Sequence, residues 1–196
     1  MLKIAVLISG GGTTLRNLIE KKAANLLNAE IVLVLASSPK AGGLRFAKEA
    51  GIEHHVVEIK SSATPEEIEK LSGEMLQRCE QAGVDLVVLG GFLKKLTVPT
   101  KWEGRIINIH PALIPSFCGK GFYGRRVHQA VLDYGVKLSG CTVHYVDNEY
   151  DHGAVIVQKA VPVLAEDTPE TLAERVFQTE CEALPEAINL IAETKQ

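Results

Sequence analysis

Short apolar runs in the first 110 residues are typical of buried β-strands. They are rich in Val, Ile and Leu, and they cover Lys3–Ile8, Glu30–Ala36, His54–Val57, Leu86–Leu89 and Arg105–Ile109. Between them, Thr13–Lys22 and Gly42–Ala50 have the apolar spacing of helices. Strands that alternate with helices predict βαβ units and a parallel sheet. The sequence therefore indicates an α/β fold.

A further helix is predicted to begin at Pro65. Thr64 is a good N-cap residue, proline suits the first helical position, and Glu67 can complete a capping box with Thr64.

The pattern changes after Pro111. The stretch to Arg125 is rich in Gly and Pro without a sustained period, so we expect a loop, and loops often carry function. The elements predicted beyond it are a helix over Arg126–Tyr134, strands over Leu138–Val146 and Ala154–Val163 joined by an ordered loop at Asp147–Gly153, and a long helix capped by Thr168-Pro169 and running towards Thr194. No repeat or linker is evident, so we expect a single domain, residues 1–196, with halves 1–100 and 101–196.

Composition and charge narrow the class of protein. Of the 196 residues, 46% are hydrophobic and 23% charged, which is typical of a soluble globular enzyme. The formal net charge is −3 and no block of Lys and Arg occurs, so nucleic acid is not an expected partner. No stretch approaches the roughly 20 apolar residues that cross a bilayer, so no membrane association is expected.

The first apolar run and the cysteines indicate the cellular compartment. The first run, from Met1 to Ile8, is broken by Ser9 and three glycines before a cleavage pattern develops, so it is predicted to be a strand rather than a signal peptide. The four cysteines are widely spaced without a CxxC pair, which favours free thiols over a zinc site or a disulfide framework. A cytoplasmic protein without a metal is the expected result.

A glycine-rich turn is the first candidate binding site. Ser9-Gly10-Gly11-Gly12-Thr13-Thr14 joins the first predicted strand to the first helix, where backbone N–H groups and the helix dipole favour an anion such as phosphate. Leu15 occupies the third glycine position of the dinucleotide fingerprint, and no Gly-Lys-Ser/Thr follows for a nucleoside triphosphate. A plain tight turn is the alternative.

The end of the fifth predicted strand is the second candidate. Period-two alternation sends Asn108 and His110 to the same side, at the strand end that faces the ligand crevice of open α/β sheets. An amide donor beside an imidazole can stabilise an oxyanion and move a proton. A pair that only hydrogen-bonds the following loop is the alternative, and spacing alone favours it.

An acidic residue and several histidines complete the candidates. Asp151, in the loop before the last predicted strand, can keep a nearby imidazole protonated, although a lone carboxylate in a polar loop is usually just solvated. His144 fits a supporting histidine better than a catalyst. His54, His55 and His128 show no partner pattern.

Taken together, these segments resemble the glycinamide ribonucleotide formyltransferase family of purine biosynthesis along nearly the whole chain. The matching segments, in the family's order and spacing, are Ser9–Leu15, Val87–Leu93, Asn108–Pro115, Gly140–Val146 and Asp151–Gly153. The resemblance implies a Rossmann-like formyltransferase fold with helices on both faces of a mostly parallel sheet and antiparallel C-terminal strands. It also implies 10-formyltetrahydrofolate as the co-substrate, without a metal, and Asn108, His110 and Asp151 at the catalytic positions.

The resemblance also implies binding residues. Gly11, Gly12, Thr13 and Thr14 fall at the phosphate site of the ribonucleotide, and Glu180 falls where the family holds the glycinamide end. The residues at the folate-binding positions are Leu93, Lys94, Lys95, Leu96, Asn108, Asp147 and Asp151. The implied partners are small molecules, glycinamide ribonucleotide and folate, and a homodimer is left open.

Three departures from the family pattern affect these implications. Gly12-Thr13-Thr14 replaces Gly-Ser-Asn, so side-chain contacts to phosphate are in question. Pro65 and Lys95 replace an arginine and an apolar residue near the folate, and the loop Cys118–Gly124 is longer than in many relatives.

Other functions are compatible with these residues, and one of them is formyl transfer to another phosphorylated amine. A 10-formyltetrahydrofolate hydrolase shares the Asn, His and Asp but usually has an additional N-terminal domain. Formyltransferases for methionyl-tRNA or sugar nucleotides normally have additional C-terminal segments. A non-catalytic folate- or phosphate-binding module would tolerate loss of the three polar residues, all of which are present.

Overall fold

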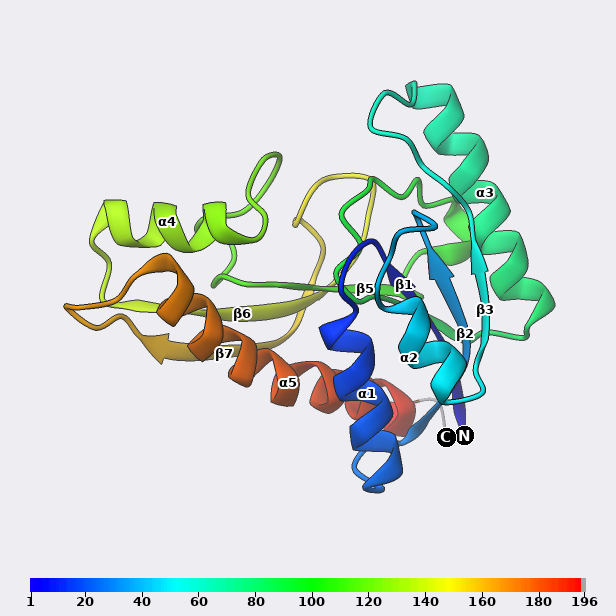
Figure 1. Cartoon of the computed structure of the whole chain (residues 1–196), viewed down its shortest axis with the longest axis horizontal. Coiled ribbons are helices and arrows are strands. Elements are labelled where there is room, and N and C mark those ends of the chain that lie inside the picture. Colours follow the sequence, from blue (N-terminus) through cyan, green and yellow to red (C-terminus); the bar gives the residue numbers. More distant parts are fainter. Residues whose placement is uncertain (195–196) are drawn as a thin grey trace. The chain divides into compact units, whose positions relative to one another are not determined.

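The computed structural model describes residues 1–194, which form alternating strands and helices (Figure 1). The strands are β1 (Leu2–Ile8), β2 (Ala29–Ala36), β3 (Glu53–Val56), β4 (Leu86–Leu89), β5 (Ile106–His110), β6 (Leu138–Tyr145) and β7 (Val155–Pro162). The helices are α1 (Thr13–Ala23), α2 (Leu44–Glu49), α3 (Pro65–Gln81), the short 3₁₀ helix η1 (Thr100–Trp102), α4 (Arg125–Tyr134) and α5 (Pro169–Thr194).

The predicted elements are confirmed, with ends shifted by one or two residues. The largest helical shift is at α2, which begins at Leu44 rather than Gly42. Gly43 packs against Gly12, where an added Cβ would lie 2.8 Å from the Gly12 Cα atom, so this glycine belongs to the turn. The predicted start of α3 is confirmed, because the Thr64 hydroxyl accepts the Glu67 N–H and the Glu67 carboxylate accepts the Thr64 N–H.

The strands form one sheet in the order β3-β2-β1-β4-β5-β6-β7. β1 pairs in parallel with β2 and β4, β2 pairs in parallel with β3, and β6 pairs antiparallel with β7. The first five strands therefore have the Rossmann order, and the antiparallel strands follow at the C-terminal end. The predicted mostly parallel sheet with antiparallel C-terminal strands is confirmed.

The order of the first four strands also determines where their helices lie. The crossovers through α1 and α2 lead outward from β1 to β3, whereas the crossover through α3 leads back across β1 to β4. Because such crossovers are right-handed, α3 covers the opposite face from α1 and α2. Figure 1 shows β2 and β3 between α2 and α3. Helices on both faces explain why β1 is an almost continuous apolar run.

The chain forms two compact units. One comprises Met1–Ile107 together with the chain from Ile188, and the other comprises Asn108–Ala187. The glycine turn belongs to the first unit, whereas Asn108, His110, Asp151 and Glu180 all belong to the second.

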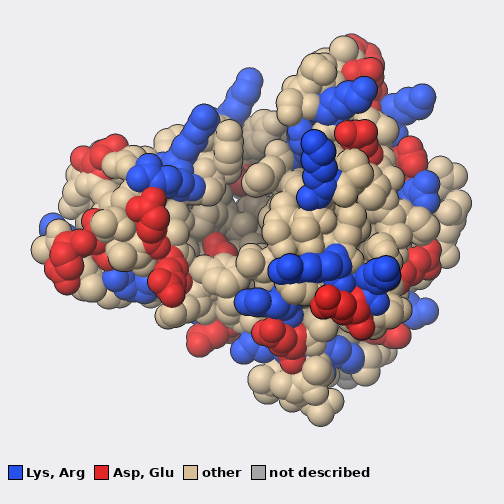
Figure 2. All heavy atoms as spheres, viewed as in Figure 1, with Lys and Arg blue, Asp and Glu red and all other residues tan. Residues whose placement is uncertain are grey.

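The surface charges are mixed in sign. Figure 2 shows acidic and basic side chains interspersed on the face in view. Within residues 1–194, none of the helices combines the length and the apolar character needed to span a membrane.

The start of α5 is held by an ion pair that allows a test of stability. Arg175 contacts both carboxylate oxygens of Asp167 at 2.6 and 2.8 Å, and Asp167 also accepts the Leu164 N–H. The Arg175 guanidinium holds the pKa of Asp167 well below its usual range. The carboxylate therefore contributes stability above its unfolded pKa, near 4, and this contribution is lost as the pH falls.

We expect Asp167→Asn to lower the free energy of unfolding at pH 7 by about 2 kcal/mol. The difference from the wild type should shrink as the pH falls below about 4. Urea titrations from pH 3 to pH 7 test this, with exposed Glu166→Gln as the control for removal of one charge. A difference that persists unchanged at pH 3 would contradict the assignment.

Candidate active site

The side chains of Asn108, on β5, and His144, on β6, contact each other. The Asn108 Nδ2 atom lies 3.3 Å from His144 Nε2, and His144 Nδ1 lies 2.8 Å from the Tyr145 carbonyl oxygen. A carbonyl only accepts hydrogen bonds, so His144 Nδ1 carries the hydrogen and Nε2 accepts one from the Asn108 amide. Burial lowers the pKa of His144 and keeps its ring neutral. This contact orients the Asn108 amide and leaves its second N–H for a ligand.

His110 has a hydrogen-bond acceptor at each ring nitrogen. Its Nε2 atom lies 2.9 Å from the Phe117 carbonyl oxygen, and its Nδ1 atom lies 3.5 Å from the Asp151 carboxylate. The His110 side chain is almost completely buried, with 4% of its surface exposed. The imidazolium form can therefore donate from both nitrogens.

Asp151 lies close to His110 and His144 on a closely packed loop between β6 and β7. Its Oδ2 atom accepts the Gly119 N–H at 2.9 Å, and its Oδ1 atom lies 3.9 Å from His144 Nε2. Asp151 has a positive φ of 52°, which is uncommon outside glycine. At Gly153 an added Cβ would lie 2.0 Å from the Tyr145 carbonyl oxygen, so only glycine allows the loop to return to β6 this closely.

A second contact within the same loop supports this conformation. The Asp147 carboxylate accepts the Glu149 N–H, and it also accepts a hydrogen bond from His152 Nδ1 at 2.7 Å. The hydrogen bond to Asp147 raises the pKa of His152. Asp147 thus links residues on both sides of Asp151 and stabilises the loop.

Thr142 fixes the backbone directly after His110. Its hydroxyl donates to the Ala112 carbonyl at 2.7 Å and accepts the Ile114 N–H at 3.1 Å. Gln158, on β7, donates to the Thr142 hydroxyl and to the Ile114 carbonyl. The segment that follows β5 is therefore held by side chains of β6 and β7.

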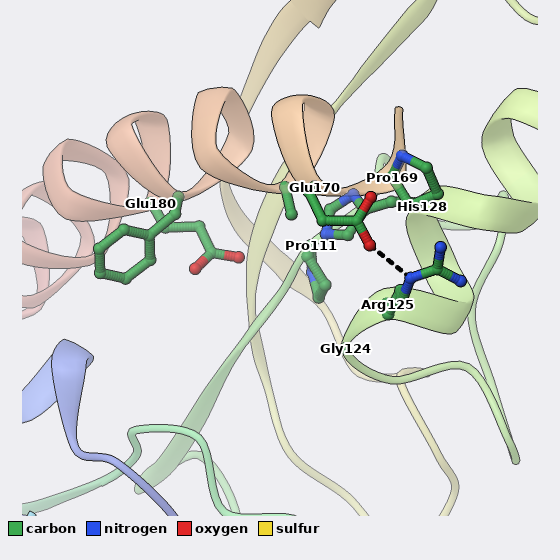
Figure 3. A pocket seen from close by; sticks show the side chains of 9 residues that line it. Pro111, Gly124, Arg125, His128, Pro169, Glu170 and Glu180 are labelled. Carbon is green, nitrogen blue, oxygen red and sulfur yellow. Dashed lines mark hydrogen bonds and ion pairs between the residues drawn. The ribbon is translucent and has the colours of Figure 1, made fainter. Parts of the chain in front are cut away.

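A pocket of about 360 Å³ lies beside the residue that follows His110 (Figure 3). Pro111, His128, Phe177 and Glu180 are among its lining residues. Figure 3 shows the Glu180 side chain extending from α5. Burial raises the pKa of Glu180 to about 8, because loss of contact with water disfavours its charged form. A cationic or hydrogen-bond-donating ligand would relieve this penalty.

The glycine turn has the geometry of an anion site within its own unit. Gly12 is the N-cap of α1 with φ of 73°, and an added Cβ would lie 2.4 Å from the Gly43 Cα atom. No side chain caps the helix, and its first turn contains no acidic residue. Gly11 and Thr13 are exposed, and Thr14 is half-buried. An anion at this helix start would meet free N–H groups and the positive end of the dipole.

The segment after β4 is tied to the same turn. The Ser9 hydroxyl accepts the Leu93 N–H at 2.9 Å and lies 2.7 Å from the Ser37 hydroxyl. Leu93 is 63% exposed, whereas Leu96 is buried. The Lys94 ammonium group donates to the Ser61 hydroxyl, and Lys95 is exposed. Leu93 thus offers an apolar surface with lysines beside it.

The structure brings Asn108, His110 and Asp151 together and places Glu180 in the adjoining pocket. Among residues 1–194, no group of three or more His, Cys, Asp and Glu side chains could hold a metal ion. Sequence reasoning gave His144 a supporting role and missed Phe117, Thr142 and His128. The backbone carbonyl of Phe117 has no sequence signal, and Thr142 does not stand out in a strand that also contains Ser139 and His144.

Several known proteins are similar to this chain over most of its length. A chloroplastic phosphoribosylglycinamide formyltransferase of Arabidopsis thaliana is 40% identical over 196 residues, which cover 98% of this chain and 66% of that protein. The trifunctional purine biosynthetic protein adenosine-3 of Gallus gallus is 45% identical over 193 residues. The chain covers only 18% of the length of that trifunctional protein.

Solved structures agree in fold. Glycinamide ribonucleotide transformylase 1 from Symbiobacterium toebii superposes with a TM-score of 0.89 at 35% identity, covering 99% of this chain and 89% of that chain. The phosphoribosylglycinamide formyltransferase from Brucella melitensis gives a TM-score of 0.84 at 39% identity, covering 97% and 95%. The model of the formyl transferase family matches residues 2–188. The chain belongs to the formyl transferase family.

Proposed function

We propose that this protein transfers the formyl group of 10-formyltetrahydrofolate to the amine of glycinamide ribonucleotide. The observation that carries the proposal is the cluster of Asn108, His110 and Asp151, an amide donor, an imidazole and a carboxylate. The Asp151 carboxylate lies near the rings of His110 and His144, and His144 contacts the Asn108 amide. Family membership and the names of the similar proteins support the same reaction.

In the proposed mechanism, the lone pair of the substrate amine attacks the formyl carbon, and the carbonyl oxygen becomes an oxyanion. The free N–H of the Asn108 amide and the Nε2–H of His110 donate to this oxygen, which takes the place of the Phe117 carbonyl at Nε2. Asp151 stabilises the His110 imidazolium and accepts the proton that the amine nitrogen releases. The bond between the formyl carbon and N10 then breaks, N10 takes up a proton, and tetrahydrofolate leaves.

Each substrate has candidate contacts in this chain. The phosphate of the acceptor binds the backbone N–H groups of the turn formed by Gly11, Gly12, Thr13 and Thr14, and its amine binds Glu180. The contacts proposed for the folate are Leu93, Lys94, Lys95, Leu96, Asn108, Asp147 and Asp151. The uncapped start of α1 and the uncompensated burial of Glu180 support the two acceptor contacts.

An assay with the purified chain tests this function. Tetrahydrofolate and formylated product are measured separately, with 10-formyltetrahydrofolate present and glycinamide ribonucleotide either added or omitted. We expect both products to form in equal amounts only when the acceptor is present. Release of free formate without the acceptor, at the same rate as with it, would show a hydrolase instead.

We also propose a reducing compartment such as the cytoplasm as the place of action. Cys79, Cys118 and Cys141 are free thiols, and burial raises the pKa of the Cys79 and Cys141 thiols to about 12. These two thiols stay protonated and unreactive near neutral pH. A homodimer stays a prediction, which sedimentation of the purified chain can check.

Glu180 provides a test in which stability and function change in opposite directions. Between its ordinary value of 4.5 and about 8, the unfolded chain releases the Glu180 proton while the folded chain keeps it. Folding therefore becomes less favourable as the pH rises through this window. We expect Glu180→Gln to increase the free energy of unfolding at pH 8 by about 1 kcal/mol or more, with little gain at pH 4.5.

Binding of the amine as a cation favours the carboxylate form of Glu180, which the glutamine variant lacks, so this variant should bind glycinamide ribonucleotide about 10-fold or more weakly. Urea titrations and calorimetry measure the two effects, with exposed Glu174→Gln on the same helix as the control. A Glu180→Gln protein with unchanged acceptor affinity would remove Glu180 from the binding site.

A further inference from the structure

His128, on α4, is a buried histidine whose hydrogen-bonding capacity the protein does not satisfy. Only 4% of its surface is exposed, and its Nδ1 atom has no hydrogen-bond partner. Leaving such a buried polar atom unpaired is unfavourable, because it loses its hydrogen bonds to water without replacement. Among residues 1–194, the Ser139 hydroxyl is the other buried side-chain polar atom in this state. Unpaired buried groups of this kind are unusual and require a reason.

The surroundings of His128 suggest that reason. Its ring lines the same pocket as Glu180 and Pro111, and Pro111 directly follows His110 (Figure 3). Burial, with a smaller contribution from nearby His110, lowers the pKa of His128. The ring is therefore neutral near pH 7 and has one nitrogen with a free lone pair. The His128 imidazole and the Glu180 carboxyl group thus line one small pocket beside the candidate catalytic residues.

A primary amine complements this pair of groups. To attack a formyl carbon, the amine must be unprotonated, with its lone pair directed at that carbon. Two hydrogen-bond acceptors that each take one N–H leave the lone pair directed away from both of them. A site with one acceptor would allow the amine to rotate and lose this alignment.

We propose that His128 is a substrate-binding residue whose imidazole accepts one N–H of the acceptor amine while the Glu180 carboxylate accepts the other. His128 thereby determines specificity for a primary amine and aims its lone pair. This inference rests on the proposed function, and it adds a residue that neither the sequence motifs nor the family resemblance identified.

The experiment combines changes in the protein with a change in the ligand. Dissociation constants are measured by calorimetry, without folate, for glycinamide ribonucleotide and for its analogue in which hydrogen replaces the amine. The wild type should bind the amine-bearing ligand about 10-fold or more tightly. His128→Phe should lose most of this preference while its affinity for the analogue changes little.

Two amide variants separate hydrogen bonding from packing. An asparagine amide lies close to the position of Nδ1 and a glutamine amide close to that of Nε2, so His128→Asn or His128→Gln should retain part of the preference for the amine. His55→Phe, which replaces a partly exposed histidine outside the pocket, is the control. Thermal melting confirms that each variant is folded, and the amide variants provide the test if His128→Phe is not.

The outcomes distinguish this inference from the proposed function. A wild type that transfers formyl to glycinamide ribonucleotide, with an amine preference equal in all His128 variants, would overturn the role of His128 and leave the function standing. A wild type that shows no preference for the amine would also overturn it. A wild type that does not bind glycinamide ribonucleotide at all would contradict the proposed function itself.

Discussion

Replacing His110 with alanine is expected to reduce the turnover number of formyl transfer by roughly 100- to 1000-fold. In the proposed mechanism the Nε2–H of His110, which lies 2.9 Å from the Phe117 carbonyl oxygen, donates to the oxyanion instead, and this hydrogen bond strengthens only as the charge develops. Ground-state binding of the folate depends little on that hydrogen bond, so its dissociation constant should change less than about threefold. The effect should therefore appear in kcat rather than in binding.

Single-turnover kinetics and folate titrations by fluorescence separate these quantities. His55→Ala removes a partly exposed histidine on β3 and should behave as the wild type. Because the His110 ring is buried, the melting temperature of the variant must be measured as well. A well-folded His110→Ala protein with an unchanged turnover number would exclude His110 from the mechanism.

The placement of Asn108 and His110 on the same side of β5 could be predicted because it depends on local geometry. Residues two apart on a strand share a side, and the end of a parallel strand faces the ligand crevice. The position of Asp151 near this strand end was expected only from the family resemblance, since a lone carboxylate in a loop has many possible positions. Its contact with His110 depends on the close return of the loop at Gly153.

Other parts of the site depend on contacts between distant segments, which periodicity does not reveal. His128 was set aside because its sequence neighbours offer no partner, yet its pocket is completed by Phe177 and Glu180, about 50 residues later. The role of Thr142 likewise appears only when β6, β7 and the segment after His110 are seen together. Backbone groups such as the Phe117 carbonyl leave no trace in the sequence at all.

Replacing Thr13 with glutamate is expected to weaken the binding of glycinamide ribonucleotide by about 100-fold or more. Thr13 is the first residue of α1 and is exposed, and the first turn of this helix contains no acidic residue. A carboxylate placed there would compete for the same N–H groups as the phosphate and would repel it. At an effective dielectric constant near 20, two unit charges about 4 Å apart repel by roughly 4 kcal/mol, so a 100-fold loss is a conservative expectation.

The same substitution should leave the protein as stable as before or slightly more stable, because an acidic side chain at a helix start interacts favourably with the dipole, typically by about 0.3 to 1 kcal/mol. This opposite sign separates lost binding from a damaged fold. Gly12→Val would be a poorer test, since the added side chain meets the Gly43 backbone and the turn requires a positive φ. Thr13→Gln has a side chain of similar size without the charge, and it is the matched control.

Calorimetry with glycinamide ribonucleotide, with inorganic phosphate as the smaller probe, gives the affinities of the wild type and both variants. The loss in Thr13→Glu should become smaller as the salt concentration rises, because charge repulsion at an exposed site is screened. Thr13→Gln should stay within about threefold of the wild type if backbone N–H groups provide most of the binding, since these groups are unchanged in it. Equal affinities in all three proteins at low salt would show that the acceptor phosphate binds elsewhere.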